Sequence, residues 1–191
     1  WDDQSLLIVI ADVMGKGISA ALLAALFRSQ ARSLSEMAVR PADLLNRINM
    51  RITPDLEAVE MFITAQIIFV DRAARRLRIA GAGHCPALLT SPDRSSPLLE
   101  LCSTGGPLGL KPDSQYEQIE VTWPIDGRLL LFTDGVTDSR SPSGELFGMN
   151  RLKSWFCEEI YRGRDAAGMK GDLAQALDQF RDHRDRQDDE A

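Results

Sequence analysis

The chain has 191 residues, of which 44% are hydrophobic and 26% are charged, a balance typical of a globular domain with a substantial core. The formal net charge of −6 argues against nonspecific binding to nucleic-acid phosphates. The three cysteines have no C-x-x-C spacing, so we expect buried, reduced thiols rather than a disulfide scaffold or a zinc site. No apolar run approaches the ~20 residues of a membrane-spanning helix, and we expect a cytoplasmic domain without a membrane span.

The first third of the sequence predicts one strand followed by two helices. Residues 5–11 (SLLIVIA) form a short apolar run rich in β-branched residues, which favours a buried strand. Residues 12–17 (DVMGKG) then predict a turn from this strand into a helix over residues 18–37, where apolar positions recur with helical spacing. Pro41 is placed to open a second helix over residues 41–52.

The rest of the sequence predicts a series of strands followed by two more helices. The six predicted strands, separated by Gly, Pro, Ser and Asp, cover residues 62–70, 76–80, 86–90, 98–102, 115–123 and 128–132. Helical spacing returns over residues 149–161 and 172–183, with a loop predicted over residues 163–171. This order indicates a single α+β domain in which helix pairs pack against antiparallel sheets.

Two aspartates follow strongly apolar strands and are each followed at once by a turn. Asp12 follows LLIVIA and Asp134 follows LLLFT. An aspartate at the end of a buried strand needs compensation for its charge, so the pair suggests a shared divalent cation. Capping of the next turn or helix is the alternative explanation for each of them. The Asp188-Asp189 pair is a third candidate, although from composition alone a solvated charged segment is the better explanation.

Other familiar catalytic patterns are absent or weak. The glycines around Lys16 lack the spacing of a nucleotide-binding P-loop, and the serines have no nucleophile-elbow context. His84 lies in a glycine-rich turn, where a lone histidine is more often structural than catalytic.

Five ordered motifs together resemble one family. They are residues 12–22 (DVMGKGISAAL), 80–89 (AGAGHCPALL), 106–109 (GPLG), 131–138 (LFTDGVTD) and 187–189 (QDD). In this order they resemble the SpoIIE-type bacterial branch of the metal-dependent PPM (type 2C) serine/threonine protein phosphatases. The resemblance extends from about residue 5 to residue 189.

The resemblance implies a fold and a metal site. The fold would be a sandwich of two antiparallel β-sheets flanked by helix pairs. Asp12 would bridge two Mn²⁺ or Mg²⁺ ions, the carbonyl of Val13 would help to hold one, and Asp134 and Asp188 would hold the other. Oxygen ligands of this kind suit these hard cations. Two ions would activate a hydroxide that attacks the phosphate directly, so no protein nucleophile would be needed.

The resemblance also implies a place in bacterial signalling. The substrate would be phosphoserine or phosphothreonine on a partner protein, with a STAS-type anti-anti-sigma protein the expected class, in partner-switching or two-component signalling. A catalytically degenerate module that regulates by binding is the alternative. The family's earlier acidic motif would precede Trp1 and a final core strand would follow Ala191, so the domain is expected to be incomplete at both ends, with a sensor or receiver domain upstream. Residues 1–191 alone are then expected to have weak or no turnover, and a homodimer remains open.

Three further expectations concern individual residues of these motifs. Gly15 and Gly17 should adopt backbone conformations that allow the turn into the helix, with Lys16 exposed. His84 should lie near the metal-binding end of the sandwich. In the wider family this position carries an acid that can join a third metal ion, so a histidine here implies at most two ions.

Overall fold

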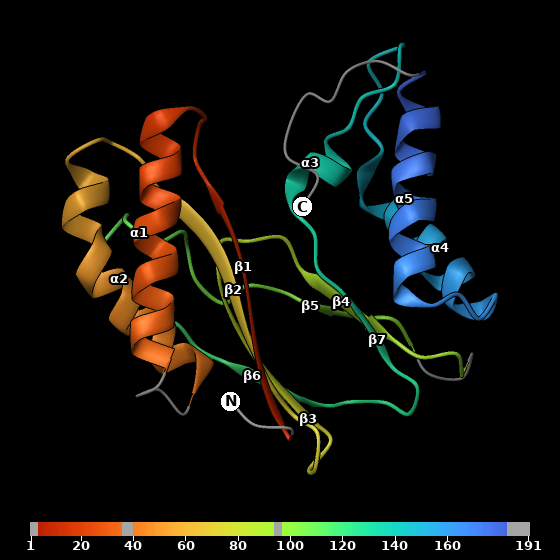
Figure 1. The fold of residues 1–191 in the computed structure, drawn as a ribbon, viewed down its shortest axis with the longest axis horizontal. Coiled ribbons are helices and arrows are strands. Elements are labelled where there is room, and N and C mark those ends of the chain that lie inside the picture. The colour runs from red at the N-terminus through yellow and green to blue at the C-terminus, as the bar shows by residue number, and fades with distance from the viewer. Residues whose placement is uncertain (1–3, 36–39, 94–96, 183–191) are drawn as a thin grey trace. The chain divides into compact units, whose positions relative to one another are not determined.

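The computed structural model describes residues 4–35, 40–93 and 97–182. The chain forms two compact units, one made of residues 1–86 and 101–123 and the other of residues 87–100 and 124–191. One sheet has four strands in the order β1-β2-β3-β6, and the other has three in the order β5-β4-β7 (Figure 1). The predicted α+β class with two antiparallel sheets and packed helices is confirmed.

The first unit contains a long antiparallel sheet and two helices. Its elements are β1 (Ser5–Val13), α1 (Ile18–Ser35), α2 (Pro41–Glu57), β2 (Ile63–Asp71), β3 (Arg76–Ala82) and β6 (Ile119–Thr122). β1 and β2 pair along their full lengths, and β2 and β3 form a hairpin. Figure 1 shows α1 and α2 side by side along this sheet.

The two faces of this sheet differ in composition because side chains alternate along each strand. The odd-numbered residues of β1 pack against the hydrophobic core that includes Leu23 and Phe27 of α1 and Leu45 and Ile48 of α2. The odd-numbered residues of β2 belong to the same core. Asp12 is even-numbered and therefore lies on the face of the sheet away from the helices.

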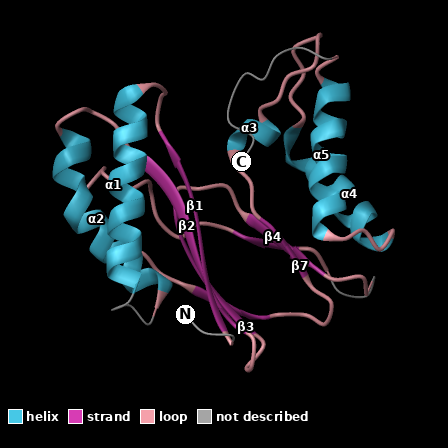
Figure 2. Ribbon diagram, viewed as in Figure 1, coloured by secondary structure: helices cyan, strands magenta, loops and turns pink. Residues whose placement is uncertain are grey.

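The second unit contains the shorter sheet and three helices. Its elements are β4 (Ala87–Thr90), β5 (Leu99–Leu101), β7 (Arg128–Leu130), α3 (Asp134–Thr137), α4 (Gly148–Tyr161) and α5 (Ala166–Phe180), with the helices and strands distinguished by colour in Figure 2. β4 pairs antiparallel with β7, with Leu88 opposite Leu130. Phe147, just before the start of α4, and Phe180, at the end of α5, form an edge-to-face contact with ring centres 5.3 Å apart.

Several predicted boundaries were wrong, and packing or capping explains the differences. β1 continues past residue 11 through Asp12 and Val13, because both pair with β2. α2 runs beyond residue 52 to Glu57, where the fully buried Leu56 joins the core. α5 begins at Ala166 instead of 172, since the carboxylate of Asp165 accepts a hydrogen bond from the Gly168 amide and caps the helix.

Two more differences concern the ends of α1 and β7. The described part of α1 ends at Ser35, and the predicted continuation to 37 lies outside the described residues. β7 ends at Leu130, and the short helix α3, which we did not predict, begins at Asp134.

Candidate metal centre and the loops around it

Asp12 is the penultimate residue of β1, just before the turn that leads to α1. It pairs with Thr64 of β2, and the next pair is Val13 with Ile63. The Met14 amide donates to the Phe62 carbonyl at 3.0 Å, which extends the ladder by one more bond. The backbone of Asp12 is held in a paired strand. The residue is only half-buried, so solvent can still reach it. This combination suits a residue that binds a cation.

The turn after Asp12 depends on its two glycines. Gly15 and Gly17 have φ values of 81° and 87°, in the left-handed region that side chains with a Cβ rarely adopt. The Ala21 amide then donates to the Gly17 carbonyl at 3.1 Å as α1 begins. Lys16, between the glycines, is exposed. These observations confirm the predicted backbone role of both glycines and the exposure of Lys16.

His84 lies at the same end of this sheet as Asp12, and its predicted closeness to a metal stays a prediction. Its Nδ1 atom is 2.9 Å from Oγ1 of Thr64, the residue opposite Asp12 in the strand register. The His84 side chain is buried, and its backbone carbonyl accepts a hydrogen bond from Ser103 Oγ at 2.9 Å. Gly83 donates its amide to the Gly105 carbonyl at 2.7 Å. The predicted motif around His84 is therefore joined to the loop that leads into the GPLG motif.

The GPLG motif is anchored to α2 by Asn49, a residue that our reading of the sequence missed. Asn49 is fully buried, its Oδ1 accepts from the Gly109 amide at 3.0 Å, and its Nδ2 donates to the Lys111 carbonyl at 2.7 Å. Leu108 exchanges two backbone hydrogen bonds with Ile63, the residue beside Thr64. The motif is thus tied to the start of β2 on one side and to α2 on the other.

A tyrosine completes the anchoring of this loop. The Tyr116 amide donates to Oδ1 of Asn46, and its hydroxyl donates to the Pro107 carbonyl at 3.4 Å. Burial raises the pKa of the Tyr116 hydroxyl above its ordinary value. Three of the five motifs therefore meet at one end of the sheet in the first unit.

Asp134 belongs to the second unit and is the first residue of α3. Its carbonyl accepts hydrogen bonds from the Asp138 amide at 2.7 Å and from Thr137 Oγ1 at 3.1 Å, which closes a single helical turn. The residue is exposed, whereas Phe132 and Thr133 just before it are buried. An apolar segment therefore delivers an accessible carboxylate to the start of a tight turn.

The predicted ligand set is described only in part. Asp12 and Val13 lie in the first unit, Asp134 lies in the second, and Asp188 lies outside the described residues. The described residues contain no group of three or more His, Cys, Asp or Glu side chains placed to hold a metal. The donor types nevertheless fit Mg²⁺ or Mn²⁺, since carboxylate and carbonyl oxygens are the ligands these cations prefer. A shared ion between Asp12 and Asp134 stays a prediction.

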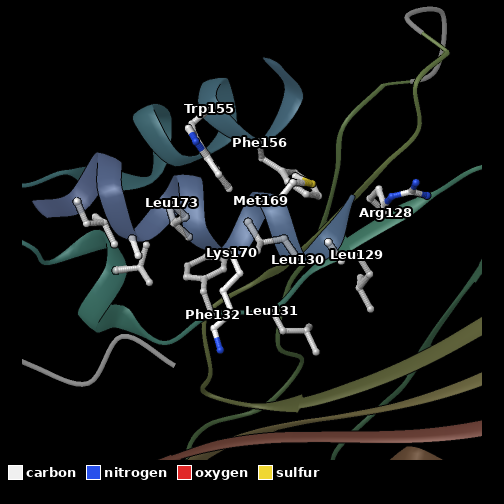
Figure 3. A pocket seen from close by; sticks show the side chains of 14 residues that line it. Arg128, Leu129, Leu130, Leu131, Phe132, Trp155, Phe156, Met169, Lys170 and Leu173 are labelled. Atoms are coloured by element: carbon white, nitrogen blue, oxygen red, sulfur yellow. The ribbon is translucent and has the colours of Figure 1, made fainter. Parts of the chain in front are cut away.

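The second unit also contains an apolar cavity of about 440 Å³ (Figure 3). Five consecutive residues, 128–132, line one side of it, so the cavity follows the edge of β7 rather than one face of the strand. One stripe of α5 at helical spacing, including Met169, Leu173 and Leu177, lines the opposite side together with Trp155 and Phe156 of α4. None of the described residues that line this cavity is acidic, and none of the described candidate ligands is among them.

The cysteines and the helices bear on two remaining expectations. None of the three cysteines is in a disulfide, but Cys102 is exposed and Cys85 and Cys157 are only half-buried, so the expectation of buried thiols was wrong. Cys85 lies just before β4, Cys102 directly follows β5, and Cys157 lies on α4. Among the helices that the structure describes, none combines the length and apolar character needed to span a membrane.

A family model described as Stage II sporulation protein E (SpoIIE) matches residues 2–191, and the chain belongs to this family. It is 32% identical over 145 residues to the phosphoserine phosphatase RsbU of Bacillus subtilis (strain 168), a match that covers 76% of this chain and 43% of RsbU. The chain thus spans less than half the length of this curated relative.

Two solved structures show the same fold. The SiaA-PP2C domain of Pseudomonas aeruginosa superposes with a TM-score of 0.87 at 23% identity, covering 100% of this chain and 75% of that one. RsbX, crystallised in complex with magnesium, superposes with a TM-score of 0.71 at 19% identity, covering 100% of this chain and 80% of that one. The fold is therefore that of PP2C-type phosphatase domains, as the sequence motifs indicated.

Proposed function

We propose that this chain is the catalytic domain of a metal-dependent phosphoprotein phosphatase that removes phosphate from phosphoserine or phosphothreonine on a signalling partner. Its membership of the SpoIIE family over residues 2–191 is the observation that carries the proposal. RsbU, its relative, is named a phosphoserine phosphatase. We expect the substrate to be a small STAS-type anti-anti-sigma protein, and the setting to be cytoplasmic signalling under an upstream regulatory domain.

Each candidate ligand has its own proposed role in binding the cations. Asp12 would bridge two Mn²⁺ or Mg²⁺ ions, Val13 would add its carbonyl, and Asp134 and Asp188 would hold the second ion. The magnesium complex of RsbX, a protein of the same fold, supports divalent-metal dependence. Two such ions, when bound, supply positive charge that activates water and neutralises phosphate oxygens during in-line displacement.

The residues of the first unit fix the geometry that this reaction needs. The paired strand holds Asp12 in one orientation, because both neighbouring positions of β1 are in register with β2. In the turn after Asp12, glycine occupies both positions with positive φ, so no side chain is strained there. A carboxylate fixed in this way binds a cation with little loss of conformational freedom.

The alternative is a phosphatase-fold module that binds the partner without hydrolysis. The two proposals are separated by a single-turnover assay, with residues 1–191 in excess over a STAS-domain protein phosphorylated on serine. Excess enzyme makes even slow hydrolysis visible. Phosphate release would be followed with and without Mn²⁺, and Mn²⁺ binding would be measured separately by calorimetry.

We expect slow release that requires Mn²⁺, and a decrease by about two orders of magnitude or more in Asp12→Asn and Asp134→Asn. Asp113→Asn is a matched control, because Asp113 is an exposed aspartate in the loop before β6. Binding of the phosphorylated partner together with binding of Mn²⁺ in calorimetry, but with no Mn²⁺-dependent release, would overturn the enzymatic proposal in favour of the binding module.

A further inference from the structure

One side chain, that of Thr64, links the position of the candidate ligand Asp12 to the glycine-rich loop around His84. Asp12 and Thr64 are direct cross-strand partners in the β1–β2 ladder. Side chains of such partners point to the same face, with Cβ atoms about 4.5–5.5 Å apart. Oγ1 of Thr64 in turn lies 2.9 Å from Nδ1 of His84. Thr64 therefore pairs with Asp12 across the ladder and contacts the His84 imidazole through its hydroxyl.

The imidazole has a fixed position because its backbone is held from several sides. His84 is 7% exposed, and its carbonyl accepts the Ser103 hydroxyl. Gly83 has a φ of +66°, and a Cβ at this position would lie 2.7 Å from Pro107 Cδ. Only glycine allows the approach of these two loops, so the sequence Gly83-His84 places the ring against Thr64 with little freedom to move.

The chemistry of a threonine hydroxyl makes this arrangement directional. The hydroxyl has one proton to donate and lone pairs to accept. If His84 Nδ1 carries a proton and donates it to Thr64, the hydroxyl proton is available to the carboxylate of Asp12. The opposite tautomer would draw the hydroxyl proton to the ring and turn oxygen lone pairs toward a carboxylate, which is unfavourable.

We propose that Thr64 and His84 are positioning residues for Asp12: His84 donates from Nδ1 to Thr64, and the Thr64 hydroxyl donates to the Asp12 carboxylate. This inference rests on the proposed function of Asp12 as a metal ligand. Outer partners of this kind orient a metal ligand, and their loss typically weakens metal binding about 10–100-fold. His84 thus acts on the metal centre without binding the metal.

The test uses two substitutions at Thr64 and one control. Thr64→Val keeps the shape of the side chain but removes the hydroxyl, and Thr64→Ser restores the hydroxyl. Thr122→Val is the control, because Thr122 is an exposed threonine on β6, in the same sheet. Mn²⁺ affinity is measured by calorimetry, and urea unfolding without metal shows whether each variant is folded.

We expect Thr64→Val to weaken Mn²⁺ binding about 10-fold or more, Thr64→Ser to recover most of the affinity, and Thr122→Val to leave it unchanged. A purely structural threonine would change unfolding but not show this rescue of metal affinity. Equal Mn²⁺ affinity in wild type and a folded Thr64→Val would overturn the inference while leaving the phosphatase proposal intact.

A second readout does not depend on metal. Nitrogen chemical shifts of ¹⁵N-labelled histidine distinguish the two neutral tautomers, and we expect the Nδ1–H form for His84 in the wild type. The Nε2–H form would overturn the inference on its own. Absence of Mn²⁺ binding and of phosphate release in the wild type, with His84 in the Nδ1–H form, would instead overturn the proposed function, and the role of His84 toward a metal ligand with it.

Discussion

Replacement of Asn49 by alanine should loosen the loop that carries the GPLG motif. Asn49 is a fully buried polar residue on α2, and its amide group bonds to three backbone groups of residues 109–112. The alanine variant keeps the helix, since alanine has the highest helix propensity. Besides these bonds it removes one contact from the Thr53 hydroxyl, which keeps its 2.7 Å hydrogen bond to the Asn49 carbonyl. The loss therefore measures the anchoring itself.

The magnitude follows from which of these groups water can reach. Lys111 and Pro112 are exposed, so water can replace Asn49 at their carbonyls at little cost. Gly109 is buried, and its amide would lose its acceptor at a cost of about 1–3 kcal/mol. Lost packing around the missing amide group adds about 1 kcal/mol. We expect the free energy of unfolding of the first unit to fall by about 2–4 kcal/mol.

Urea unfolding followed by circular dichroism gives the free energy, and hydrogen exchange at the Gly109 amide gives the local effect. The amide should be protected in the wild type and exchange freely in Asn49→Ala. Arg47→Ala is the control, because Arg47 is exposed on the same helix. A change below about 0.5 kcal/mol with the Gly109 amide still protected would refute the reasoning, since that is the range of ordinary surface substitutions.

Three more predictions concern other parts of the structure. Gly83→Ala should lower the melting temperature strongly, because the added Cβ would clash with Pro107 and the φ of +66° is strained for alanine; an unchanged melting curve would contradict this. The hydrogen bond from the Arg78 guanidinium holds the pKa of Glu120 below its usual value. The ion pair therefore stabilises the fold at pH values above the unfolded-state pKa of Glu120, and this stabilisation is lost as the pH falls through the folded-state pKa. Glu120→Gln should therefore lower the melting temperature near about pH 7 but not near about pH 2, and an equal effect at both would argue against it. Phe156→Ala should cost about 3 kcal/mol in chemical unfolding, because this 2% exposed ring is part of the second unit's core; a loss under 1 kcal/mol would mean that the neighbours collapse into its place.

The strands of the first unit could be predicted because the apolar residues follow the period of a sheet buried against helices. The hairpin of β2 and β3 was predicted for this reason, although β2 is shifted by one residue to Ile63–Asp71 and β3 extends beyond residue 80 to Ala82. The end of β1 was placed too early at the polar residue Asp12, since the apolar run stops there while the pairing with Thr64 continues. The hydrogen-bonded pairing of the two strands thus extends beyond the apolar run from which the strand was predicted.

Two functional candidates escaped prediction because their importance lies in contacts distant in sequence. Asn49 carried a usable signal: it is a polar residue within the buried stripe formed by Leu45, Ile48 and Ile52. A polar side chain on a buried stripe must find partners, although the sequence does not say which ones. Thr64 carried no such signal, since threonine is common in strands and its register opposite Asp12 follows only from pairing.

Each unit is assembled from two separate stretches of chain, with boundaries at residues 86/87, 100/101 and 123/124. The sheet of the first unit is complete only when β6 pairs with β3, and that of the second only when β7 pairs with β4. β6 ends at Thr122 and β7 begins at Arg128, so a ribosome synthesising the chain supplies both closing strands almost together. Neither sheet can be completed before these strands are synthesised. A polypeptide cut anywhere between residues 87 and 118 would lack both β6 and β7 and would leave both sheets open at once. Truncation within this stretch should therefore yield no autonomous half, and folding should depend on contacts made late in synthesis.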